Sequence, residues 1–193
     1  VIRPQRADFP DYRGYAGRVA GGVLRVGDEI MVLPSGLTST ITGIDSPTGP
    51  LQEATPGQAV TVLLADDLSI TRGDMICRPN NRPRVSQELE AMLCWMDDTA
   101  PLQPGKIYSI KHTTKVARTK ITEVLYRLNI STLSRETGVN QLAMNEIGRV
   151  TLHTTAPLMF DDYHQNRTTG CFIIVDESTG QTAGAGMLLS PRT

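Results

Sequence analysis

The sequence contains no apolar run approaching the roughly 20 residues that a membrane-spanning helix needs. It is also poor in aromatic residues, with three Phe, one Trp and five Tyr, so it offers few side chains on which bases stack. The formal net charge is only −1. These shortages exclude a spanning helix, weigh against a nucleic-acid partner held by charge, and favour a soluble globular protein.

Cysteine is scarce as well. Cys77, Cys94 and Cys171 lie far apart without C-x-x-C spacing, and the three histidines show no ligand spacing with them. We therefore expect no metal site and a reducing, cytoplasmic location. The sequence has neither an initiating Met nor a basic and apolar leader, so we expect a fragment of a longer polypeptide.

A phosphate-binding loop is also absent. Residues 15–28 are rich in glycine, but they contain no Lys and lack both the P-loop and the G-x-G-x-x-G spacing. Gly21-Gly22 and Gly27-Asp28 are typical of tight turns between strands. A second glycine cluster at residues 182–187 favours a crowded strand that another backbone approaches closely.

No catalytic pattern is present either. Ser35 and Ser190 lack a G-x-S-x-G frame, and the adjacent acids at 66–67, 97–98 and 161–162 are typical of solvated loops. We predict no catalytic, cofactor-binding or metal-binding residue.

What the sequence does contain is alternation of apolar and polar residues with a period near two, interrupted by frequent Gly and Pro turn signals. Candidate strands are residues 29–33, 38–44, 58–64 and 89–96. This pattern predicts an all-β sandwich or barrel protein.

Residues 116–128 fit two interpretations. Ile121, Val124, Leu125 and Leu128 have helical spacing, whereas the β-branched residues around them favour a long strand with a bulge. We favour the strand, although periodicity alone leaves both open.

The best domain boundary is the segment 78–83, where prolines and asparagines interrupt the apolar pattern. We predict two domains, residues 1–83 and residues 84–193. All the lysines belong to the second.

A run of cations is the most informative charge feature, because no acid occurs between Asp98 and Glu123. It favours contact with an acidic partner or a phosphate, or else a solvated sheet edge on which lysines prevent strand pairing. The loop at 166–170 favours an Asx turn or a polar contact surface. The candidate contact residues are Lys106, Lys111, His112, Lys115, Arg118, Lys120, Asn166 and Arg167.

Several motifs carry a family resemblance. The pattern Y-x-G-R-V-x-x-G-x-L-x-x-G-D at 15–28, followed by E-I-M-V-L-P-S-G, resembles the second domain of elongation factor Tu-type GTPases. Six further segments resemble the large GTPase subunit of bacterial sulfate adenylyltransferase. They are R-G-D-M-I-C-R-P at 72–79, L-E-A-M-L-C-W-M-D at 89–97, I-K-H-T-T at 110–114, N-E-I-G-R-V at 145–150, N-R-T-T-G-C-F-I-I-V-D at 166–176 and T-A-G-A-G-M at 182–187.

The resemblance implies two antiparallel β-barrels, like domains 2 and 3 of elongation factor Tu-like GTPases. It places GTP and Mg in an amino-terminal G domain outside this sequence, and formation of adenosine 5′-phosphosulfate from ATP and sulfate in a separate small subunit. The implied partners are that small subunit, the chain's own G domain and, in fused forms, an adenylylsulfate kinase beginning near the tail at residues 189–193. The alternative is that the barrels bind tRNA or other RNA in a translation factor.

Overall fold

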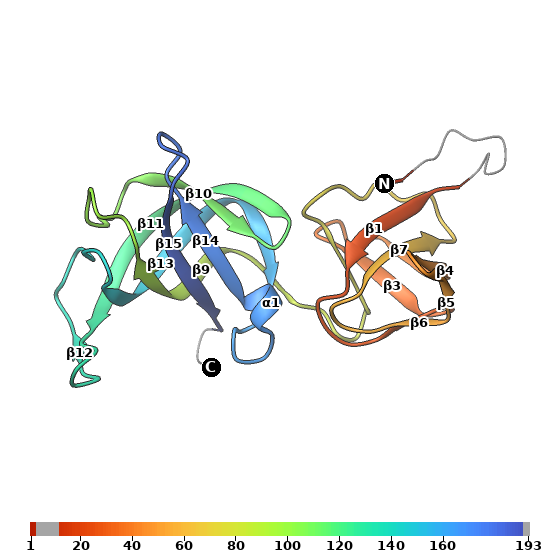
Figure 1. The fold of residues 1–193 in the computed structure, drawn as a ribbon, viewed down its shortest axis with the longest axis horizontal. Helices are drawn as coiled ribbons and strands as arrows, with labels where there is room; N and C mark the ends of the chain where they lie inside the picture. The colour runs from red at the N-terminus through yellow and green to blue at the C-terminus, as the bar shows by residue number, and fades with distance from the viewer. Residues whose placement is uncertain (3–11, 191–193) are drawn as a thin grey trace. The chain divides into compact units, whose positions relative to one another are not determined.

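The computed structural model describes residues 1–2 and 12–190. These residues are almost entirely β-structure, with one short helix, α1, which confirms the all-β prediction (Figure 1). Contacts divide the chain into two compact units, Val1–Pro83 and Arg84–Thr193. The end of the tail, residues 191–193, lies outside the described residues.

The first unit is an antiparallel sheet around a small apolar core. Its strands are β1 (Gly14–Arg18), β2 (Leu24–Arg25), β3 (Glu29–Leu33), β4 (Thr38–Ser46), β5 (Gly49–Leu51), β6 (Glu53–Ala54), β7 (Ala59–Leu64) and β8 (Met75–Cys77). The main sheet has the order β1-β7-β4-β3-β8, β5 pairs with β4, and β2 pairs with β6 in a separate ribbon. Gly22 and Gly27 have φ of 68° and 91°, values that glycine adopts readily, so residues 15–28 turn the chain as predicted.

The second unit is a closed barrel. Its elements are β9 (Arg84–Trp95), β10 (Ile107–His112), β11 (Lys115–Leu128), β12 (Arg135–Glu136), β13 (Ile147–Phe160), α1 (Arg167–Gly170), β14 (Cys171–Val175) and β15 (Thr182–Leu189). The strands follow the order β10-β14-β15-β9-β13-β11, and β11 pairs again with β10, which closes the ring. Strand β12 lies outside the ring, paired only with the end of β11.

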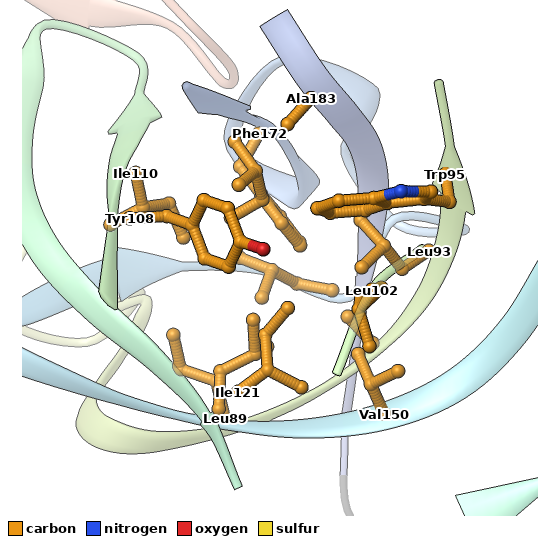
Figure 2. Close-up of a cluster of buried hydrophobic side chains, with 14 of the residues drawn as sticks. Leu89, Leu93, Trp95, Leu102, Tyr108, Ile110, Ile121, Val150, Phe172 and Ala183 are labelled. Carbon is orange, nitrogen blue, oxygen red and sulfur yellow. The ribbon is translucent and has the colours of Figure 1, made fainter. Parts of the chain in front are cut away.

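The barrel interior is filled by alternating side chains from its strands (Figure 2). Trp95 and Tyr108 are almost completely buried and meet edge to face, with ring centroids 5.5 Å apart. The Trp95 indole Nε1 donates to the carbonyl of Ala100 at 2.8 Å, so its polar atom is satisfied inside the core.

Strand β11 resolves the ambiguity at residues 116–128 in favour of a bulged strand. Ala117, Thr119 and Ile121 alternate as buried residues, and the register then shifts between Ile121 and Glu123 and again between Val124 and Tyr126. A bulge adds one residue, so the buried positions Ile121 and Val124 are three apart. The apparent helical spacing is therefore produced by the bulge.

The second glycine cluster lies in β15, as predicted. A Cβ at Gly184 would lie 3.0 Å from the carbonyl oxygen of Cys94 on β9. A Cβ at Gly186 would lie 2.3 Å from the Phe172 ring, so this glycine makes room for a core side chain. Both glycines are required by packing.

Candidate partner-contact surface

The cationic run, Lys106 to Lys120, begins just before strand β10 and continues into β11. Both strands belong to the closed ring of the second unit. Strand β10 pairs with both β11 and β14, and β11 pairs with both β10 and β13. The sheet-edge interpretation of the lysines is therefore wrong, because these strands have their neighbours on both sides.

Two of the predicted contact residues hold a hairpin within the barrel. The Lys106 ammonium donates to Asp176 at 2.7 Å, and the Arg118 guanidinium makes a two-pronged contact with Glu177 at 3.0 and 2.6 Å. The hydrogen bond from Lys106, followed by that from Ser178, holds the pKa of the Asp176 carboxyl well below its usual value. Both cations are thus neutralised by the turn that joins β14 to β15.

His112 is buried, which contradicts its assignment as a partner-contact residue. The residue is 1% exposed, and its ring Nε2 donates to the carbonyl of Thr169 at 2.6 Å. Burial lowers the pKa of His112, against the opposing effects of the Thr169 hydrogen bond and the Asp161 charge. His112 is in phase with buried Tyr108 and Ile110 on β10, so strand alternation faces it inward.

The loop at 166–170 forms the predicted Asx turn. The Asn166 side chain accepts hydrogen bonds from the amides of Thr168 and Thr169, and so caps α1. The Thr169 hydroxyl donates to Asp161 at 2.7 Å, and His112 reaches the carbonyl of the same residue. This network joins α1 to the end of β10.

At this end of the barrel, three cations have no carboxylate partner among the described residues. Lys111 is exposed at the end of β10, Lys115 is half-buried at the start of β11, and Arg167 is exposed on α1. Among the described residues none of the three forms an ion pair. We call Lys111, Lys115 and Arg167 the basic end. Lys120 is exposed farther along β11, where it pairs in register with His153.

The adjacent acids of the second unit serve structural roles. Asp97 accepts from the amide and hydroxyl of Thr99, and Asp162 accepts from the amides of His164 and Ser190. In the first unit, Asp66 accepts from the Ser39 hydroxyl at 2.8 Å. These carboxylates hold turns and chain ends in place within loops, and Asp66, Asp67 and Asp98 are exposed, as the sequence indicated.

Within residues 1–2 and 12–190, no group of three His, Cys, Asp or Glu side chains is arranged to hold a metal ion. No helix there is long and apolar enough to cross a membrane.

The sequence interpretation did not single out the loop at residues 129–134, which leads into β12. Residues 129–134 form a loop in which Ile130 and Leu133 are 68% and 74% exposed. The available signal was the presence of two large apolar residues between Ser, Thr and Asn in N-I-S-T-L-S.

Comparison with protein families matches both units. A family described as "GTP-eEF1A C-terminal domain-like" matches residues 88–189, over half of the chain. The chain belongs to this family. Elongation factor Tu domain 2 matches residues 15–77, so the GTP-eEF1A C-terminal-like barrel is preceded by a second translation-factor domain.

The chain is similar in sequence, over nearly its whole length, to curated proteins. It is 51% identical to the bifunctional enzyme CysN/CysC of Mycobacterium tuberculosis over 98% of its length, and 44% identical to sulfate adenylyltransferase subunit 1 of Aeromonas hydrophila over 93%. It is 40% identical to sulfate adenylyltransferase subunit 1 of Bacteroides fragilis over 98%. These relatives confirm the resemblance drawn from the motifs, and the chain spans 31%, 37% and 38% of their respective lengths.

The fold is also that of solved translation-factor structures. The crystal structure of Sup35 complexed with GDP matches 94% of the chain with a TM-score of 0.83 and 16% identity, and the chain covers 46% of that structure. At this identity the likeness concerns the fold alone.

Proposed function

We propose that this chain is the non-catalytic pair of β-barrel domains of a GTP-dependent sulfate adenylyltransferase large subunit. The observation that carries the proposal is the 40–51% identity, over 93–98% of the chain, to proteins named sulfate adenylyltransferase subunit 1 and CysN/CysC. In this proposal GTP and Mg bind a G domain elsewhere in the same polypeptide. ATP and sulfate are converted to adenosine 5′-phosphosulfate in a separate small subunit, and the complex is cytoplasmic.

The barrels then transmit the nucleotide state of the G domain to the small subunit. Such transmission requires rigid bodies whose contacts differ between two states. The closed barrel supports this role, because its strands pair around the whole ring and its acids stabilise turns. The fused kinase of a bifunctional form is a further proposed partner, by analogy with the CysN/CysC relative.

The test uses the full polypeptide that carries these residues, together with its small subunit. We expect formation of adenosine 5′-phosphosulfate to depend on GTP and to stop with a non-hydrolysable GTP analogue. Equal rates with and without GTP contradict the coupling. The RNA-binding alternative instead predicts tRNA retention on filters with a steep salt dependence.

The basic end provides a sharper prediction. The Lys111→Glu, Lys115→Glu double variant should bind the small subunit or the G domain about tenfold more weakly at low salt, because opposite charges attract across an interface. Titration calorimetry at two ionic strengths checks this, and the difference should shrink at higher salt.

The matched control for this variant is Lys120→Glu, which changes an exposed cation farther along β11. Circular dichroism of each variant verifies that the barrel is intact. Unchanged affinity of the double variant for both partners removes the basic end from the interface.

A further inference from the structure

The ring of the second unit has one short seam, between β10 and β14. Strand β10 pairs with β11 along its whole length, Ile107–His112, but within the described residues it pairs with β14 only over Ser109–Lys111. The other neighbouring strands of the ring, over the same described residues, are joined over longer stretches. His112, the last residue of β10, and the turn that follows it therefore extend beyond the backbone pairing with β14.

A side chain closes the seam where this pairing ends. The His112 ring Nε2 donates to the carbonyl of Thr169 in α1 at 2.6 Å, and both residues are buried. Because a carbonyl oxygen can only accept a hydrogen bond, Nε2 carries the proton. This contact joins the β10–β11 hairpin to the segment that leads into β14.

Helix α1 is the fixed side of the contact. The Thr169 hydroxyl donates to Asp161 at 2.7 Å. A Cβ on Gly170 would lie 2.4 Å from the Cα of Tyr163, so α1 packs directly on the chain that follows β13. The Tyr163 amide in turn donates to the carbonyl of Leu188 on β15 at 3.0 Å. These supports of α1 are independent of β10.

The hairpin turn is the movable side of the contact. His112 and Lys115 are opposite each other in register, so two exposed residues, Thr113 and Thr114, connect β10 to β11. Thr113 has φ of 49°, in the left-handed region that a β-branched residue rarely occupies. Such a strained backbone persists where its surroundings enforce it. The buried contact of the adjacent His112 supplies this constraint.

The three cations of the basic end lie on both sides of the seam. Lys111 precedes His112, and Lys115 is the register partner of His112, so both lysines belong to the hairpin. Arg167 belongs to α1. Closing the seam therefore brings like charges together, and their repulsion favours an opened turn. Asp161, whose charge acts on His112, offsets at most one of the three.

We propose that His112 is a latch that closes the barrel at the basic end, and that an acidic surface bound across the three cations stabilises the latched turn. The assignment of that surface to the small subunit rests on the function proposed above. Binding and latching are then linked: the latch raises the affinity for the partner by the same factor by which the partner stabilises the latch. The barrel responds to its partner by a local closure that leaves the core unchanged.

Hydrogen exchange of the full polypeptide alone tests the latch. His112→Leu removes the donor, so the amides of residues 113–116 should exchange about tenfold faster while those of β9 stay unchanged. His112→Gln retains a donor and should restore slow exchange. The matched control is His153→Leu, which removes a ring from β13 outside the seam. Equal acceleration in β9 and the turn, or the same acceleration in the control, overturns the latch.

Neutralising the cation on the fixed side tests the repulsion. In Arg167→Gln the hairpin is unaltered, and exchange at residues 113–116 should become about twofold to threefold slower at low salt, with no difference at high salt. Lys120→Gln removes a cation of β11 outside the basic end and should have no effect. An unchanged rate in Arg167→Gln overturns the proposal. A faster rate also overturns it, because the free polypeptide then already holds an anionic surface, such as its own G domain, at the basic end.

Adding the small subunit tests the linkage. Exchange at residues 113–116 of the unchanged polypeptide should slow about tenfold, His112→Leu should bind the small subunit about tenfold more weakly, and His112→Gln should restore the affinity. Binding without a change of exchange at the turn overturns the linkage. If the small subunit does not bind, the proposed function fails and the linkage with it, whereas the latch is still decided by the polypeptide alone.

Discussion

His112 and Thr169 show how single residues join motifs that are far apart in the sequence. The segments I-K-H-T-T and N-R-T-T-G meet where the His112 ring donates to the Thr169 carbonyl, across 57 residues of chain. The Thr169 hydroxyl continues the network to Asp161. Burial of the ring disfavours its charged form.

This burial predicts acid sensitivity. The pKa of His112 is lowered in the folded chain, whereas the unfolded value is near 6.5. Below about pH 6.5 the unfolded chain takes up a proton that the folded chain excludes, so the free energy of unfolding should decrease as the pH falls further. Urea denaturation at about pH 7.5, 6.5 and 5.5 measures this decrease.

In the His112→Gln variant, an amide can donate to Thr169 without titrating, so the pH dependence should become flatter. His164→Gln, which removes an exposed imidazole, serves as the control variant. An unchanged slope in His112→Gln assigns the acid sensitivity to other groups.

Gly186 gives a second prediction. Gly186→Ala should lower the free energy of unfolding by about 1–3 kcal/mol, because its Cβ would lie 2.3 Å from the Phe172 ring. Gly17→Ala on β1 is the matched control: it meets nothing within 4 Å, and its effect should be close to zero. Equal effects in guanidinium denaturation contradict the packing argument.

The turn between β14 and β15 is an element stabilised by charge. Asp176 accepts from Lys106, from the amide of Ser178 and from that of Thr179, and its side chain is 8% exposed. Glu177 contacts Arg118 and Ser109, and its side chain is 33% exposed. Asp176 is therefore expected to contribute more to the stability of this turn than Glu177 does.

Asp176→Ala should lower the melting temperature by about 5 °C or more, because it leaves several donors unpaired. Glu177→Ala should have a much smaller effect, since exposed ion pairs contribute little. Calorimetric scans of both variants at the same pH check the order. A larger effect of Glu177→Ala would contradict it.

The strands that were predictable from sequence were those with unbroken alternation. Residues 29–33 coincide with β3, whereas β9 begins at Arg84, five residues before the predicted start at 89. The early part of β9 was missed because its burial pattern shows no alternation before Leu89. In β11, two bulges interrupt the alternation of buried and exposed residues, so the sequence pattern there did not identify a strand unambiguously.

The contact surface was less predictable because it depends on pairings distant in sequence. Lys106 and Asp176 are separated by 70 residues, and Arg118 and Glu177 by 59. A local count of cations cannot show that these two are neutralised. The burial of His112 could have been predicted from the sequence, since its alternation with Tyr108 and Ile110 already indicated an inward side chain.

For the whole molecule, the proposed separation of nucleotide binding from these barrels leads to one further prediction. Residues 1–193 expressed alone should neither bind GTP at micromolar concentration nor hydrolyse it, because no phosphate-binding motif is present in the sequence. Titration calorimetry with GTP and Mg measures this, and the full polypeptide is the positive control. Micromolar binding by residues 1–193 would contradict the proposal.

Closure of the second barrel places its first and last strands side by side. Strand β9 pairs with β15, and Glu90 lies opposite Leu189, so the two ends of this unit are carried by adjacent strands. A short linker joining them, with new termini cut at the turn after Asp176, would preserve every strand pairing of the ring. The barrel is thus suited to circular permutation, which would move the attachment point of any neighbouring domain to the opposite end of β14 and β15.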